Sequence, residues 1–304
     1  MQERSGVSEL TARPPARPTA GLEWGLIPAV PVPFRGSAID AAAQRAYATW
    51  MARQEIAGVA VWAHTGRGPH LSADQRRVVL ETWRAALSGK TIVAGANSES
   101  MARDAKRGGA DALLAFPRHD DPVAYHAALA RELPVIAFYL YDAAGGVSYD
   151  DATLHAILSV PGVLGIKVAT LDSVMTFQRI ATLMRDHPDK LLITGEDRFL
   201  GYSLMMGARA ALIGMGAALT DVQAALLRAY ASKDEHACVR LSTQLDAFSQ
   251  VTFTEPMEGY IRRMLWALAA DGVIPDDACD DPWGPPLPAT QREAVRRFVR
   301  EARV

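Results

Sequence analysis

The chain alternates short apolar runs with longer amphipathic stretches, and this alternation limits the fold more than any other feature. From residue 24 onward, eight runs rich in β-branched and apolar residues have the length of buried strands: 24–30, 58–62, 91–95, 112–116, 135–139, 163–167, 191–194 and 210–213. Helix-like stretches lie near 40–56, 72–88, 99–108, 121–132, 150–159, 172–186, 198–207 and 219–232. Eight consecutive βα units predict an α/β fold, a (β/α)₈ TIM barrel.

The two ends of the chain depart from this pattern. Residues 1–20 mix prolines with charges and predict a flexible N-terminal arm. After residue 232 no further strand is expected, and helical stretches lie near 233–250, 256–271 and 289–302. We therefore expect an arm (1–20), a barrel (21–232) and a C-terminal helical region (233–304) that covers the barrel or meets a second subunit.

Composition favours small-molecule chemistry. Of the 304 residues 49% are hydrophobic and 22% are charged, and the formal net charge is −2. Such a chain has no overall positive field for nucleic acid or for an anionic membrane, and its most apolar segment, 203–227, is interrupted by charges and glycines. The two cysteines, Cys238 and Cys279, form no CxxC pair, which suits a cytoplasmic protein.

Lys167 stands inside an apolar run that otherwise has the character of a buried strand. The sequence contains five lysines and 27 arginines, so a positive charge alone is usually supplied by arginine here. Arginine stays protonated, whereas a desolvated lysine can lose its proton and attack a carbonyl group. Lys167 is therefore either a Schiff-base lysine or a lysine at a strand end whose amine reaches solvent.

Barrel enzymes carry their chemistry at the carboxyl ends of the strands, so the residues there are candidates for a site. They are His64, Thr65, Gly66 and Arg67 after the second strand, Arg118 after the fourth, Tyr139 and Tyr141 at the fifth, Gly195 after the seventh, and Ile213 and Gly214 at the eighth. A tyrosine beside the lysine is suited to move protons, and the backbone N–H groups of Thr65 and Gly66 to bind a carboxylate. Arg118 meets the far end of a substrate or lies in a solvated loop.

Several of these segments resemble one family, the dihydrodipicolinate synthase and N-acetylneuraminate lyase family of Schiff-base barrels. The resemblance covers about residues 24–300 and rests on Gly165-Ile166-Lys167, on 191–197, on 28–34, and on Tyr139, which precedes Lys167 by 28 residues. It implies that Lys167 condenses with a 2-oxo acid such as pyruvate and that Tyr139 shuttles protons. It implies no metal and no organic cofactor, and it predicts a homo-oligomer, a dimer or a tetramer. If the alignment is off by two residues, Tyr141 takes the place of Tyr139, since alternate residues share a strand face.

The chain also departs from the family pattern. Where the family has Gly-Thr-Thr-Gly-Glu or Gly-Ser-Thr-Gly-Glu, this sequence has Ala63-His64-Thr65-Gly66-Arg67. His64 either joins a proton relay or only fills space. Arg67 binds a second carboxylate or pairs with an acid such as Asp74.

Three functions stay open on this basis, in order of preference. The first is a lyase for aldol cleavage, condensation or dehydration. The resemblance implies that it is not a dihydrodipicolinate synthase, because those synthases bind the semialdehyde carboxylate with an arginine shortly after the tyrosine, and this sequence has no arginine or lysine between Arg131 and Lys167. The second is a phosphate-handling barrel enzyme without a covalent intermediate, which would bind phosphate at residues 214–216. The third is a catalytically idle relative that binds keto acids.

Overall fold

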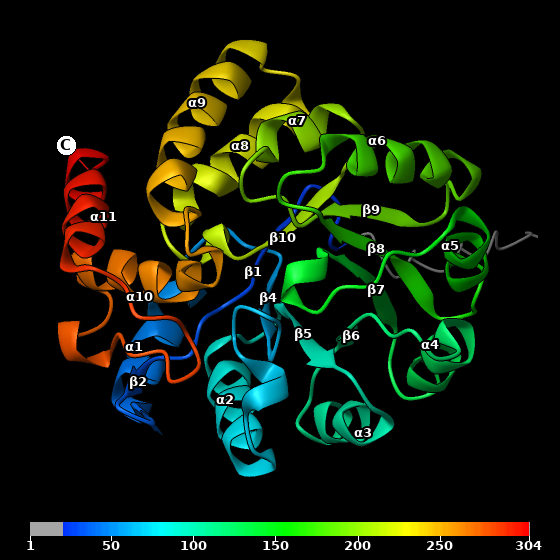
Figure 1. Ribbon diagram of the computed structural model, residues 1–304, viewed down its shortest axis with the longest axis horizontal. Coiled ribbons are helices and arrows are strands. Elements are labelled where there is room, and N and C mark those ends of the chain that lie inside the picture. Colours follow the sequence, from blue (N-terminus) through cyan, green and yellow to red (C-terminus); the bar gives the residue numbers. More distant parts are fainter. Residues whose placement is uncertain (1–20, 304) are drawn as a thin grey trace, which may run out of the picture.

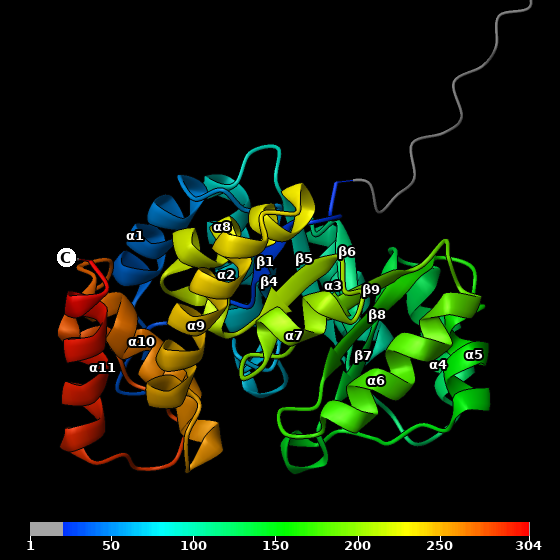
Figure 2. The ribbon, with the colours of Figure 1, turned by 90° about the horizontal axis from the view of Figure 1, so that it is seen from above.

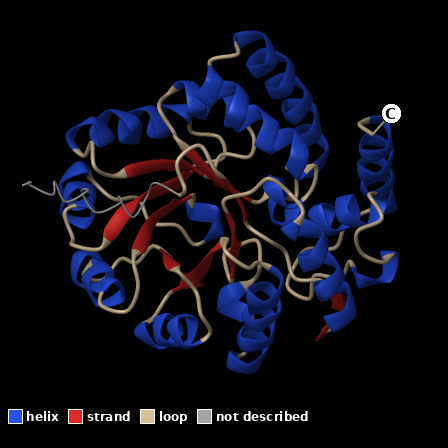
Figure 3. Cartoon of the chain, turned by 180° about the vertical axis from the view of Figure 1, so that it is seen from behind, coloured by secondary structure: helices blue, strands red, loops and turns tan. Residues whose placement is uncertain are grey.

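Eight parallel strands form a barrel in the computed structural model, which describes residues 21–303, and helices surround it (Figures 1 and 3). The predicted arm, 1–20, lies outside the described residues. Neighbouring strands follow the order β1-β10-β9-β8-β7-β6-β5-β4. The barrel closes between β1 and β4, where Val30 N–H donates to the Ala60 carbonyl oxygen at 3.1 Å. The predicted (β/α)₈ fold is confirmed.

The barrel strands lie where the apolar runs predict them. Their bounds are β1 Leu26–Pro28, β4 Gly58–Val61, β5 Thr91–Ala96, β6 Ala112–Ala115, β7 Val135–Leu140, β8 Val163–Ala169, β9 Leu191–Thr194 and β10 Ala210–Ile213. A small antiparallel hairpin, β2 Phe34–Arg35 and β3 Ala38–Ile39, was not predicted. Because both faces of a parallel barrel sheet are covered, the strands are apolar throughout, which is the signal that made them visible in the sequence.

The helices that follow the strands form the outer ring. They are α1 Ala41–Ala52, α2 Ala73–Ala86, α3 Glu99–Arg107, α4 Pro122–Ala130, α5 Asp151–Leu158, α6 Val174–Leu183, α7 Leu200–Met205 and α8 Thr220–Ser232. Side-chain hydrogen bonds to the backbone help to fix where helices begin. At α2 the Ser72 side chain accepts a hydrogen bond from Gln75 N–H, and the Gln75 side chain accepts one from Ser72 N–H. No helix among residues 21–303 has the length and apolar character needed to cross a bilayer.

Alternate strand residues divide the core into two parts. An inner core fills the barrel with side chains such as Ile136, Phe138 and Leu212, and an outer core lies between strands and helices with side chains such as Ala137 and Tyr139. Side chains of successive strand residues point to opposite faces, so neighbours in the sequence belong to different cores. This alternation decides which polar residues can reach the mouth of the barrel.

Three C-terminal helices flank the barrel on one side (Figures 1 and 2). They are α9 Glu235–Thr252, α10 Tyr260–Ala270 and α11 Ala289–Glu301, close to the predicted positions. Helix α9 runs along α8, and α10 packs against α11. The segment between α9 and α10, residues 253–259, and the start of α10 bring further side chains to the carboxyl ends of the strands.

Candidate active site

Lys167 projects from β8 into the barrel and is 5% exposed. Its Nζ lies 4.1 Å from the centroid of the Phe138 ring, because Phe138 occupies the paired position on β7. Burial lowers the pKa of Lys167 to about 8, although the carboxyl groups of Asp197 and Glu196 oppose this effect. The amine is therefore held where an appreciable fraction is unprotonated near neutral pH, as a nucleophile requires.

Two buried acids follow β9 beside the lysine. Asp197 accepts a hydrogen bond from Met215 N–H at 2.6 Å, and Glu196 accepts from Thr170 N–H at 2.7 Å and from Leu171 N–H at 3.0 Å. Burial raises the pKa of both carboxyl groups, although the hydrogen bonds from these backbone N–H groups act to lower it. The preceding residue is Gly195, where a Cβ atom would lie 2.6 Å from Lys167 Cε, so a side chain there would displace the amine.

A small cavity surrounds the lysine amine. Its volume is about 20 Å³, enough for one water molecule. The lining residues come from five strand ends and from the C-terminal region: His64, Thr65, Phe138, Leu140, Tyr141, Lys167, Ala169, Leu171, Gly195, Asp197, Gly214, Phe253 and Tyr260. The lysine and several groups able to move protons thus share one enclosed space at the carboxyl ends of the strands.

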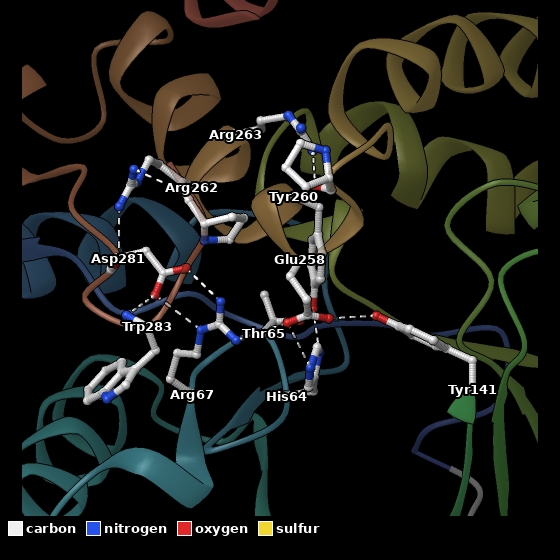
Figure 4. A network of polar contacts seen from close by, with 12 residues as sticks. His64, Thr65, Arg67, Tyr141, Glu258, Tyr260, Arg262, Arg263, Asp281 and Trp283 are labelled. Carbon is white, nitrogen blue, oxygen red and sulfur yellow. Dashed lines mark hydrogen bonds and ion pairs between the residues drawn. The ribbon is translucent and has the colours of Figure 1, made fainter. Parts of the chain in front are cut away.

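A polar network joins the loop after β4 to the C-terminal region above this cavity (Figure 4). Glu258 is at its centre: one carboxylate oxygen accepts from the Tyr141 hydroxyl at 3.0 Å, and the other lies 3.0 Å from Arg67 Nη1 and 3.3 Å from His64 Nε2. Burial acts to raise the pKa of Glu258, but its contacts with His64, Arg67 and Tyr141 outweigh it and lower the pKa to about 2. Glu258 is therefore a carboxylate at neutral pH.

Tyr260 connects the same network to Thr65. Its hydroxyl lies 3.1 Å from His64 Nδ1 and 2.9 Å from Thr65 Oγ1. Its ring stacks on Phe253 with a centroid distance of 4.6 Å, and the residue is 5% exposed. Burial raises the pKa of the Tyr260 phenol well above its ordinary value, so the phenol keeps its proton at neutral pH.

The chain matches the family model described as the dihydrodipicolinate synthetase family over residues 23–302. It belongs to that family. A 4-hydroxy-tetrahydrodipicolinate synthase of Ruegeria pomeroyi is 29% identical, over 57% of this chain and 63% of the relative. An N-acetylneuraminate lyase of Escherichia coli is 28% identical, over 60% of this chain and 66% of the relative.

The fold of this family member also agrees with solved structures. The sialic acid aldolase of Ruminococcus gnavus superposes with a TM-score of 0.82 at 16% identity, covering 93% of this chain and 98% of that one. The predicted family is confirmed, and the names of these relatives, a synthase, a lyase and an aldolase, agree with the predicted enzyme class.

The two candidate tyrosines, Tyr139 and Tyr141, lie in different surroundings. Tyr139 pairs with Val168, lies in the outer core, and lines a separate surface cleft with Ser148. Tyr139 therefore does not line the cavity around Lys167, where the sequence led us to expect it. Tyr141 follows the end of β7, where the chain turns, and its ring reaches the lysine cavity. Of the two positions that the sequence left open, Tyr141 is the one beside Lys167.

Arg67 is held by carboxylates of the protein, although not by the predicted Asp74. It makes two hydrogen bonds to Asp281, at 3.1 and 2.7 Å, in addition to its contact with Glu258, and it is 6% exposed. Asp74 instead pairs with Arg77 on α2, where Asp74 Oδ1 lies 3.5 Å from Arg77 Nη2. The guanidinium of Arg67 is therefore an internal ion-pair partner rather than a group aimed at the cavity.

The other predicted binding residues are divided between the cavity and its surroundings. Thr65, His64, Gly195 and Gly214 line the cavity, as described above. Gly66, Ile213 and Arg118 do not: Gly66 N–H donates to Ala63 O, the Ile213 side chain is in the outer core, and Arg118 is exposed above the Tyr125 ring. The predictions for these three residues are therefore not supported by their placement.

Four residues of the C-terminal region that take part in the site were not predicted: Phe253, Glu258, Tyr260 and Asp281. None belongs to a βα unit, so the strand-end rule that located the other candidates did not reach them. The local signal was only a break between two helical stretches near residues 252–256. Contacts across 191 residues, as between Arg67 and Glu258, leave no short-range pattern.

Proposed function

We propose that this protein is a lyase that forms a Schiff base between Lys167 and the keto carbon of a pyruvate-type 2-oxo acid. The observation that carries the proposal is the buried amine of Lys167, whose pKa is lowered to about 8. A lysine without such a task would reach solvent, because burying a charged amine costs free energy. A related structure supports the substrate class: a protein of the dihydrodipicolinic acid synthase family from Escherichia coli K12 was solved in complex with pyruvate.

The chemistry follows from the amine. Unprotonated Nζ attacks the keto carbon, water leaves, and a protonated imine remains on Lys167. This imine withdraws electrons from the adjacent carbon, so a C–C bond at that carbon can break, or a proton can leave it, to give an enamine. Protonation of the enamine carbon and hydrolysis of the imine by water then release the 2-oxo acid and restore the lysine.

Tyr141, rather than Tyr139, takes the proton-transfer role. Its hydroxyl donates to Glu258, and its ring shares the cavity with Lys167. Burial raises the pKa of Tyr141, so its phenol stays protonated at neutral pH and is available as a proton donor in the cavity. Thr65, His64, Gly195 and Gly214 form the remaining wall around the substrate.

A 2-oxo acid is larger than the water-sized cavity, so we expect part of the wall to move when substrate enters. Leu171 lines the cavity but lies beyond the end of β8. Movement of its side chain would enlarge the cavity without breaking the strand hydrogen bonds. The identity of the distal group depends on this wall.

The phosphate-handling alternative is disfavoured by the contacts of residues 214–216. Met215 N–H, which would face a phosphate, donates to the Asp197 carboxyl group. A second anion beside that carboxyl group would be repelled. The idle keto-acid-binding alternative shares every contact of the proposed site and differs only in the absence of turnover.

We further expect a homo-oligomer, a dimer or a tetramer, in the cytoplasm, as the family resemblance and the cysteine content predict. Sedimentation of the purified protein measures the oligomeric state directly. A monomer at all concentrations would contradict the prediction.

Borohydride trapping tests the proposal. The protein is incubated with pyruvate, 2-oxobutanoate or 2-oxoglutarate, reduced, and analysed by intact and peptide mass spectrometry. We expect one reduced ligand mass on Lys167, and none in Lys167→Met or Lys167→Arg. Lys190→Arg is a matched control that keeps the adduct, because Lys190 lies outside the cavity. No adduct from any of the three acids would overturn the proposal; an adduct without exchange of substrate protons would favour the idle relative.

A further inference from the structure

The network above the cavity contains an ordered series of an acid, a base and a phenol. Glu258 lies 3.3 Å from His64 Nε2, and His64 Nδ1 lies 3.1 Å from the Tyr260 hydroxyl. The two ring nitrogens of His64 thus face two different partners (Figure 4). Tyr260 in turn lines the cavity that contains Lys167.

The partners fix the roles of the two nitrogens. A carboxylate accepts hydrogen bonds only, so Glu258 selects the tautomer that has its proton on Nε2. Nδ1 is then an acceptor, and the hydrogen bond in this pair runs from the Tyr260 hydroxyl to Nδ1. Contacts of this kind are often long before substrate binds and shorten in the reacting complex.

Glu258 is suited to support a proton on His64. Its pKa is lowered to about 2, so it remains charged while the imidazole changes state. Arg67 holds the same carboxylate oxygen at 3.0 Å and is itself held by Asp281, which fixes the position of Glu258. A fixed carboxylate stabilises an imidazolium without the cost of reorienting water.

Tyr260 is held by packing as well as by hydrogen bonds. Its ring stacks on Phe253, and a Cβ at Gly214 would lie 2.9 Å from Tyr260 Cε2. Thr65 Oγ1 lies 2.9 Å from the Tyr260 hydroxyl. The hydroxyl is therefore kept at the border between the cavity and His64.

We propose that Tyr260 is a catalytic acid–base residue of this enzyme, driven by His64 and Glu258, which act as positioning residues. When a proton leaves the substrate, the Tyr260 oxygen takes it and the Tyr260 proton passes to Nδ1 of His64. The electron pair left on the substrate moves into the protonated imine on Lys167, and the imidazolium is stabilised by Glu258. The reverse transfer returns the proton to the substrate. This inference rests on the proposed Schiff-base function.

Exchange of substrate protons with solvent reports the proton-transfer step by itself. The measurement does not require the second product to be known. Pyruvate or 2-oxobutanoate is incubated with the enzyme in D₂O, and loss of the C3 proton signal is followed by NMR, with borohydride trapping in parallel. We expect Tyr260→Phe and His64→Gln to slow exchange by about 10²-fold or more, the scale of a lost acid–base group. The trapped imine at equilibrium should stay near the wild-type yield in both variants.

Control variants separate a proton-transfer role from a structural one. Tyr202→Phe removes a hydroxyl on α7 outside the cavity, and Glu293→Gln removes an exposed carboxylate of α11; both should exchange at the wild-type rate. Glu258→Gln should slow exchange. In His64→Gly, added imidazole should restore exchange in proportion to its concentration, which a residue that only fills space would not show.

The outcomes distinguish the two proposals. A wild-type protein without a trapped imine overturns the Schiff-base function, and the role of Tyr260 falls with it. A wild-type protein that forms the imine and exchanges protons, together with a Tyr260→Phe variant that exchanges equally fast, overturns only the role of Tyr260. An imine without any exchange in the wild type also overturns the role of Tyr260.

Discussion

Lys167 and Phe138 occupy paired positions on β8 and β7, and the lysine Nζ lies 4.1 Å from the centre of the Phe138 ring. This pairing places even-numbered residues of β7 inside the barrel and odd-numbered ones outside. Tyr139 therefore cannot share a face with the lysine while β7 is a regular strand. Only after the strand ends at Leu140 can an odd-numbered residue, Tyr141, reach the cavity.

We predict that Tyr141→Phe slows C3 proton exchange of pyruvate by about 10²-fold, whereas Tyr139→Phe leaves the rate near that of the wild type. The first variant removes a hydroxyl inside the cavity. The second removes one whose contact is Ser148 at 3.5 Å. The NMR exchange rates of the two variants are compared directly, and a larger loss in Tyr139→Phe would contradict the placement of these residues.

The lowered pKa of Lys167 predicts the pH dependence of imine formation. Its ordinary value is 10.5, and in the folded protein it is about 8. Only the unprotonated amine attacks, so the initial rate should rise with pH and level off above a pH of about 8. Stopped-flow or quenched borohydride trapping between pH 6 and about 10 measures this. A rate still rising steeply near pH 10 would mean that the amine is not desolvated.

Removing only one partner of the ion pair between Arg67 and Asp281 should lower the free energy of unfolding. Arg67→Met leaves a carboxylate that is 3% exposed without its main partner, and such changes lower the free energy of unfolding by about 3–5 kcal/mol. Replacing both groups, as in Arg67→Met with Asp281→Leu, should recover much of this loss. Urea unfolding at pH 7 of the wild type, both single variants and the double variant gives the coupling. Additive losses would show that the pair is not a unit.

Glu258 should contribute stability that disappears in acid. Its pKa falls from an ordinary 4.5 to about 2 in the folded protein, so the folded state binds its proton less readily than the unfolded state. The contribution is complete above a pH of about 4.5 and is lost between about 4.5 and 2. Urea unfolding at pH 7 and pH 3 should therefore show a smaller pH effect in Glu258→Gln than in the wild type. Equal pH effects would refute this.

We predict that the protein does not synthesise dihydrodipicolinate, although relatives carry that name. No arginine or lysine occurs between Arg131 and Lys167, where the resemblance would place the residue that binds the semialdehyde carboxylate. Arg67 is already paired with two carboxylates, and Arg118 lies outside the cavity, so neither replaces it. A coupled assay with pyruvate, aspartate semialdehyde and the next reductase should give negligible nicotinamide oxidation. Turnover of about one per second or more would refute this.

The sequence alone determined the barrel and singled out Lys167 as its candidate nucleophile. Strand and helix periods are local properties, and eight alternations leave few topologies, so the strands fall close to their predicted bounds. Lys167 was visible because a charged residue in a buried strand stands out against its neighbours. The family motif around it reinforced that choice.

The tertiary structure decided which other groups share the cavity with Lys167. The choice between Tyr139 and Tyr141 depended on strand pairing and on where β7 ends, and a shift of one residue reverses the face. Arg67 contacts Glu258 and Asp281, and His64 contacts Glu258 and Tyr260, across 191 to 214 residues of sequence. These partners lie in the C-terminal region, whose own pattern predicts only helices. Their chemistry exists because folding brings that region over the carboxyl ends of the strands.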